Sequence, residues 1–101
     1  MDWLTLDELK DQLVIDADFK DDDKYIEQLG DSAEDAVQQL VNVDLFELAA
    51  NNGGKLPNAV RHAMRMLVDY FYAVERGSAN QDKAIPDAVF MLLKLYRNYE
   101  N

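Results

Sequence analysis

The chain of 101 residues is acidic, with a formal net charge of −10, and contains no cysteine. The missing cysteines exclude disulfides, thiolate metal sites and cysteine catalysis, and the charge argues against direct binding to DNA phosphates. With 49% hydrophobic residues, the chain is suited to a single folded domain, residues 1–101. Since the N-terminus lacks the features of a signal peptide and no apolar run approaches ~20 residues, we expect a soluble cytoplasmic protein without membrane contact.

The first predicted helix is short and runs from about Leu6 to Leu13. Thr5 and Glu8 have the spacing of a capping box, in which the two side chains bond to each other's backbone N–H groups. Leucines recur along one side of this helix at helical spacing. Trp3 lies just before the cap and is expected to pack onto Leu9.

The second predicted helix spans residues 22–42 and follows a connector from Val14 to Lys20. Three consecutive aspartates, residues 21–23, place negative charge at its start, where the helix dipole favours it. An apolar stripe continues in register on both sides of Gly30. We therefore expect one helix, which has a place to bend at the glycine.

Two further helices are predicted after residue 43. Asp44 and Glu47 form a second capping-box pattern, which indicates a short helix that ends within residues 51–54. The longer helix, residues 57–76, opens with a proline and is followed by Gly77, as is typical of helix ends. Its apolar residues recur every three or four positions and line one face: Val60, Met64, Leu67, Val68, Phe71 and Val74.

The last predicted helix, residues 86–99, follows a small polar loop, Gly77 to Ala84. One of its faces is formed by Ile85, Val89, Leu92, Leu93 and Tyr96. Phe90, Met91 and Leu95 point elsewhere at 100° per residue, so the helix is apolar nearly all round. Because so small a domain has little room to surround it, we expect this second face to meet a partner. With no predicted strand, the fold class is all-α, a small bundle of four to five helices.

The sequence holds no constellation of catalytic or metal-binding residues. Acidic residues fit four positions of an EF-hand loop, but Lys20 and Asp21 occupy the places of a ligand and of the turn glycine. His62 is the only histidine and has no carboxylate at metal-site spacing on its helix. Neither serine lies in a nucleophile elbow. We therefore predict that the protein is not an enzyme and holds no cofactor or metal.

Charge is divided unevenly between the halves of the chain. Residues 1–51 hold 15 acids and 3 bases, a net of −12, whereas residues 52–101 hold 5 acids and 7 bases, a net of +2. This is either an ordinary solvated acidic surface or a sign that neighbouring copies meet head to tail, a heterologous contact that can close into a ring. Arg61 and Arg65 lie one turn apart beside Tyr72, where they either receive an acidic partner or are solvated.

Six segments, taken in order, form a pattern that covers almost the whole chain: Leu6–Lys10, Val14–Asp16, Asp23–Ile26, Ala33–Val37, Leu56–Tyr72 and Ile85–Arg97. This pattern resembles the small helical head–tail connector proteins (adaptor or head-completion proteins, also described as DNA-packaging proteins) of long-tailed bacteriophages. Each segment alone consists mostly of residues that are typical of helix starts and ends, and only the order of the segments is specific to the family. The chain departs from the family pattern at Glu75 and Arg76, whose characters are swapped, and at Ala88, where a glycine is common.

The resemblance implies a structural role without catalysis. Such proteins form a homo-oligomeric ring between portal and tail, extend the DNA channel and complete the head after packaging. The implied partners are further copies of the chain, the portal protein and tail-side connector proteins, with DNA passing through without specific binding. The implied location is the virion neck, reached by assembly in the host bacterial cytoplasm. We expect the self-assembly or portal interface to use Phe90, Met91, Leu95, Arg97, Arg61 and Arg65.

The acidic charge is equally typical of another class of protein. A small regulatory or inhibitor protein can mimic DNA and occupy a basic partner, and long acidic rows on a rigid exposed face would favour that alternative. This alternative explains the charge but not the six ordered segments.

Overall fold

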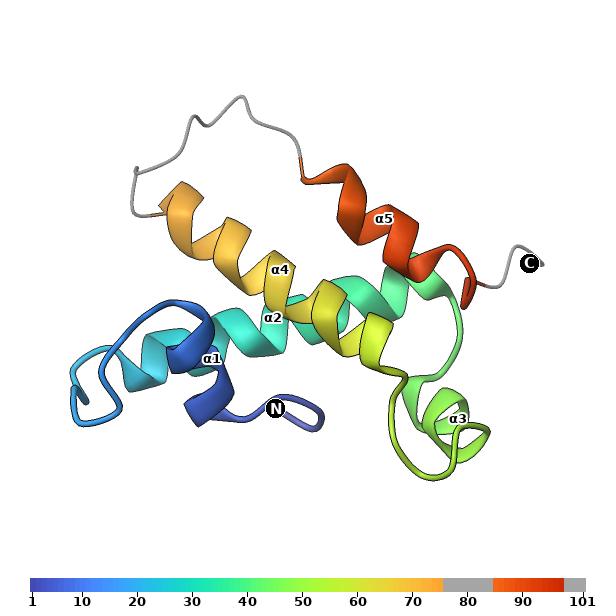
Figure 1. Cartoon of the computed structure of the whole chain (residues 1–101), viewed down its shortest axis with the longest axis horizontal. Coiled ribbons are helices and arrows are strands. Elements are labelled where there is room, and N and C mark those ends of the chain that lie inside the picture. The colour runs from blue at the N-terminus through green and yellow to red at the C-terminus, as the bar shows by residue number, and fades with distance from the viewer. Residues whose placement is uncertain (76–84, 98–101) are drawn as a thin grey trace.

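The computed structural model describes residues 1–75 and 85–97, and within them the chain is all-helical, with no strand (Figure 1). This confirms the predicted all-α bundle. The predicted loop Gly77 to Ala84 lies outside the described residues. Five helices are present: α1 (Leu6–Gln12), α2 (Asp23–Val41), α3 (Leu45–Ala50), α4 (Asn58–Glu75) and α5 (Asp87–Leu93).

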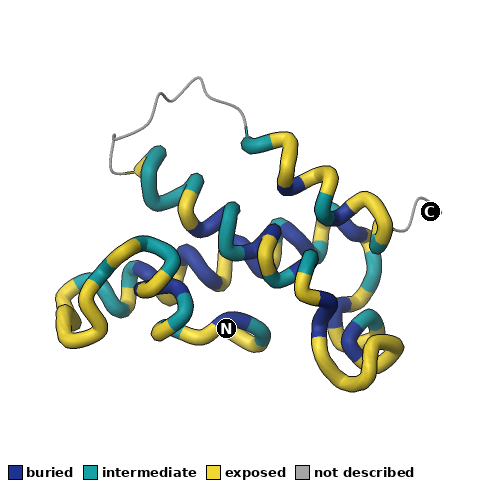
Figure 2. The backbone as a smooth tube through the Cα atoms, in the orientation of Figure 1, coloured by how far each residue is buried: buried dark blue, intermediate teal, exposed yellow. Residues whose placement is uncertain are grey.

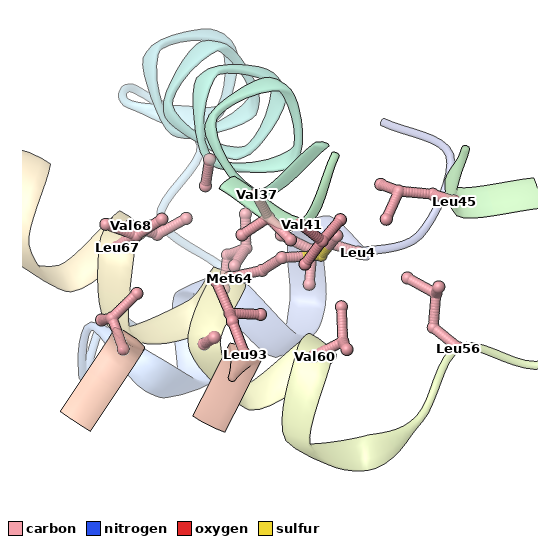
Figure 3. Close-up of a cluster of buried hydrophobic side chains, with 14 of the residues drawn as sticks. Leu4, Val37, Val41, Leu45, Leu56, Val60, Met64, Leu67, Val68 and Leu93 are labelled. Carbon is pink, nitrogen blue, oxygen red and sulfur yellow. The ribbon is translucent and has the colours of Figure 1, made fainter. Parts of the chain in front are cut away.

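The two long helices, α2 and α4, pack against each other, and the shorter α1 and α5 pack against this pair. Figure 3 shows the side chains that meet at the centre, from both long helices and from α5. The apolar stripe predicted for α4 is buried from Val60 to Val68 and only partly buried at Phe71 and Val74. The full burial of a large apolar side chain contributes about 1.5–3 kcal/mol. The fully buried members of α4 and α2 are Val60, Ala63, Met64, Leu67, Val68, Ile26, Ala33, Val37 and Val41.

α2 continues through Gly30 as one helix, as predicted. The glycine is buried because the N-terminal segment lies directly on it. A Cβ atom at Gly30 would stand 2.1 Å from Met1 Sδ and 2.9 Å from Leu9 Cδ1. The absence of a side chain therefore lets the start of the chain and α1 approach the backbone of α2 closely.

The predicted capping box of α1 is present, with Thr5 Oγ1 and the Glu8 carboxylate each accepting from the other's backbone N–H. Trp3, expected on Leu9, lies against Phe46 of α3, with ring centroids 4.8 Å apart. This contact joins the N-terminal segment to α3 and was not predicted. Asp44 caps α3 by accepting from the N–H of Phe46 at 3.0 Å, but the capping box predicted with Glu47 is not formed.

The prediction of a last helix over residues 86–99 is wrong in its length. α5 ends at Leu93, and the chain continues in turns to residue 96, with the Tyr96 N–H bonded to the Leu93 carbonyl at 3.0 Å. Of residues 94–97, only Tyr96 packs on the core, whereas Leu95 is 87% exposed. Because so little burial follows Leu93, nothing offsets the entropic cost of extending the helix. Residues 98 and 99 lie outside the described part.

A buried carboxylate holds the N-terminal segment on α2. Glu34 accepts hydrogen bonds from the backbone N–H groups of residues 2, 3 and 4, at 3.0, 2.9 and 2.9 Å. One turn earlier, the Asp31 carboxylate lies 3.0 Å from the Met1 ammonium. The hydrogen bond and the charge of Asp31 raise the pKa of that ammonium. Three successive N–H groups are thus satisfied by a single side chain, which fixes the path of the segment.

Replacement of Glu34 by Gln should lower the free energy of unfolding by about 2 kcal/mol. The amide keeps one acceptor oxygen but turns its NH₂ group toward backbone donors. Glu27→Gln is the matched control, because Glu27 is exposed on the same helix, and it should change stability by less than about 0.5 kcal/mol. Urea unfolding followed by circular dichroism measures both, and equal losses in the two variants would contradict the assigned role.

Candidate functional site

α5 has one buried and one exposed apolar face (Figure 2). Val89 and Leu93, one turn apart, are buried and attach the helix to the core. On the exposed side, Phe90 is 44% exposed and Met91 is 73% exposed, and Leu95 follows in the turn after the helix. Large apolar side chains that gather at the surface are typical of sites that bind another protein.

An open pocket of about 200 Å³ lies beside α5, where this helix passes the end of α2. Its lining is mostly apolar, and Lys94 and Arg97 add positive charge at exposed positions. An apolar floor with a charged edge matches the anatomy of protein–protein interfaces, which have an apolar centre and a polar rim. The residues that line it are Leu40, Phe90, Met91, Leu93, Lys94 and Arg97. We call these residues, together with Leu95, the α5 surface.

Four of the six predicted interface residues belong to this surface, and the other two lie elsewhere. Arg61 and Arg65 are on α4, next to α1, where both meet Glu8 of their own chain. Arg61 Nη2 lies 2.6 and 2.7 Å from the two carboxylate oxygens of Glu8, and Arg65 Nη1 lies 3.5 Å from one of them. All three side chains are one quarter to one third exposed. Within the subunit, these arginines therefore fasten α1 to α4.

Lys10 is a residue whose role the sequence analysis missed. Its side chain is buried, with Nζ 2.6 Å from the carboxylate of Asp23 at the start of α2. It also donates to the carbonyl oxygens of Ala17 and Phe19, in the connector between α1 and α2. A signal was present, because Lys10 lies one turn after Leu6 on the apolar side of α1.

Within residues 1–75 and 85–97, no group of three or more His, Asp or Glu side chains is placed to hold a metal ion. None of the helices in that part combines the length and the apolar character that a bilayer span requires.

The fold and the α5 surface are those of a small helical protein with exposed apolar side chains on its last helix. The comparison with family models is specific: residues 4–97 match the phage gp6-like head-tail connector proteins, and the chain belongs to this family. This confirms the resemblance seen in the sequence. The family is a structural one, and membership favours a connector over a DNA-mimicking inhibitor. Comparisons with curated proteins and with solved structures gave no match.

The Arg61→Gln variant should lose about 1 kcal/mol of unfolding free energy, because it removes two short charge-assisted contacts from a partly buried site. Arg65→Gln is the matched control, since its single contact is longer, and it should lose less than about 0.5 kcal/mol. Thermal and urea unfolding measure the two variants side by side. A larger loss in the Arg65 variant would show that Arg61 is not the main clamp between α1 and α4.

Proposed function

We propose that this protein forms a homo-oligomeric ring between the portal and the tail of a long-tailed phage. There it extends the DNA channel and completes the head after packaging, with no enzymatic activity. Family membership supports the connector role. The observation that carries self-assembly is the α5 surface, which leaves Phe90, Met91 and Leu95 in water in an isolated subunit.

The proposed partners follow from a position in the virion neck. One side of the ring meets the portal protein and the other side receives tail-side connector proteins, after assembly in the host bacterial cytoplasm. DNA passes through the centre without specific binding. The net charge of −10 supports this last point, because an acidic channel lining repels phosphates and does not retain the passing duplex.

Within the ring, the α5 surface is the proposed contact with a neighbouring copy or with the portal. Phe90 and Met91 supply its apolar centre, and Arg97 supplies charge at its edge. Arg61 and Arg65 belong to a different part of this proposal. Because Glu8 already occupies both of them, they stabilise the subunit that carries the surface.

The protein's mass in solution, measured by light scattering over a wide concentration range, tests the ring directly. A single closed species many times the 11.6 kDa subunit mass is the expected result. A tight dimer that never grows would contradict it, because a two-fold pair uses the same surface on both subunits and leaves none for a third. Coexpression with the portal protein and electron microscopy of the product test assembly on a template.

A double replacement, Phe90→Asp with Met91→Asp, should abolish assembly and leave the subunit folded. Met91 is 73% and Phe90 44% exposed, so the subunit loses only part of one side chain's burial, whereas an interface would have to bury two unpaired carboxylates. Light scattering measures assembly, and circular dichroism measures the fold.

The matched control for this variant is Gln28→Asp with Ser32→Asp. It adds the same charge at two exposed positions of α2, one turn apart and away from the α5 surface. Assembly should persist in the control. Intact assembly of the α5 variant would rule out the α5 surface as the contact.

A further inference from the structure

The connector between α1 and α2 is a second place where large apolar side chains are exposed. Val14 is 91% exposed and Phe19 is 45% exposed. The connector has a defined shape, because buried Lys10 donates to two of its carbonyl groups, those of Ala17 and Phe19. Because Lys10 holds the connector backbone in place, the exposed side chains of Val14 and Phe19 have a fixed position.

Val14 also has a backbone conformation that costs energy. Its φ of 58° lies in the left-handed region, which a β-branched residue rarely adopts. Its side chain gains no burial within the subunit in return. Within the subunit, nothing offsets the backbone strain or the exposure of this apolar side chain. Burial of the side chain against another copy would offset them.

The connector and the α5 surface carry opposite charge. The connector, residues 14–20, contains two aspartates and one lysine, a net of −1, and Asp21 and Asp22 follow it, whereas residues 87–97 contain two bases and one acid, a net of +1. Lys94 and Arg97 line the pocket of the α5 surface. Both patches thus combine exposed apolar side chains with charge, and the charges attract.

The two patches also lie toward opposite ends of the molecule. In Figure 1 the connector is at one end of the longest axis, which spans 40 Å, and α5 lies toward the other. One copy cannot bring its own two patches together, but two copies can. A contact between two different patches leaves one of each free on the resulting pair, so assembly continues and closes when the rotation allows.

We infer that the connector of one copy, residues 14–20, docks on the α5 surface of the next copy. Val14 and Phe19 then lie against the apolar lining of the pocket, and the connector aspartates lie near Lys94 and Arg97. This inference rests on the proposed ring and names the two surfaces that build it. The contact forms between copies of this chain alone, without the portal.

Cysteine cross-linking tests the contact directly, because the natural chain has no cysteine. The full-length variants Val14→Cys and Met91→Cys each change a largely exposed position. Mixed in equal amounts with a short bis-maleimide, they should give a covalent dimer several-fold more abundant than either variant gives alone. The protein is used up to about 1 mM, so that even a contact with a millimolar dissociation constant is populated.

The matched control is Ser32→Cys, a nearly isosteric change at an exposed position of α2. Mixed with the Met91→Cys variant, it should give only background dimer. A yield as high as that of the Val14→Cys mixture would mean that the cross-linking reports random collisions, and it would overturn the inference.

The remaining outcomes separate this inference from the proposed ring. If the wild-type chain assembles but the Val14→Cys and Met91→Cys mixture stays at background, the connector contact is wrong and the ring stands. If Met91→Cys alone cross-links as well as the mixture, α5 pairs with itself and the connector contact is again wrong. If the chain stays monomeric and uncross-linked at every concentration, a portal-independent contact is wrong, and assembly on the portal decides the ring.

The Val14→Gly variant separates an assembly role from a structural one. Glycine adopts a φ of 58° without strain, so the thermal stability of the subunit should stay the same or rise. Assembly should weaken several-fold, because the apolar side chain is gone. Reduced stability with unchanged assembly would show that Val14 serves the subunit alone, which would contradict the inference.

Discussion

The mutual burial of α2 and α4 places every other element of this fold. Each long helix has one continuous apolar stripe, and the two stripes cover each other at the centre of the molecule. The other three helices have only six or seven residues each, a length that is marginal for a helix without tertiary contacts. The stability of these short helices therefore depends on their contacts with α2 and α4. For α5 this is apolar burial, through Val89 and Leu93.

At the N-terminal side, ionic side chains supply much of the attachment. Glu34 of α2 holds the segment before α1, Arg61 of α4 holds α1 itself through Glu8, and Lys10 holds the connector at the start of α2. Among the described residues, Lys10 and Glu34 are the only charged side chains that are buried. A buried charge is tolerated only when its bonding capacity is used, and each of these two meets several backbone groups. The connector is consequently held in a fixed place.

The parts of the fold that the sequence predicted are those encoded by local patterns. The stripe of α4, the capping box at Thr5 and the uninterrupted α2 follow from spacing and residue type within a few turns. The contacts of Glu34 and Arg61 could not be predicted in this way, because their partners lie about 30 and 53 residues away in the sequence. The partners of Glu34 are also backbone N–H groups, which carry no information about residue type. The end of α5 depends on how much of the chain finds burial, which helical periodicity does not report.

For the candidate site, helical periodicity predicted the exposed face of α5 but not the exposed apolar side chains of the connector. A helix that is apolar nearly all round has one face more than the core of a small domain can use, and this could be deduced from Phe90 and Met91. The exposure of Val14 and Phe19 depends on the shape of the connector, which Lys10 sets through contacts with no periodic signature.

A single apolar patch on each subunit is not sufficient to build a ring. One self-complementary patch gives a closed pair, whereas a ring needs two different patches on every subunit. Subunits with a net charge of −10 repel each other, so the contact has to bring an acidic part of one copy to a basic part of the next. The α5 surface is basic at its edge, and it lies in the half of the sequence whose charge is positive on balance. The complement that we propose lies in the acidic half, where the connector combines exposed apolar side chains, a fixed backbone and negative charge.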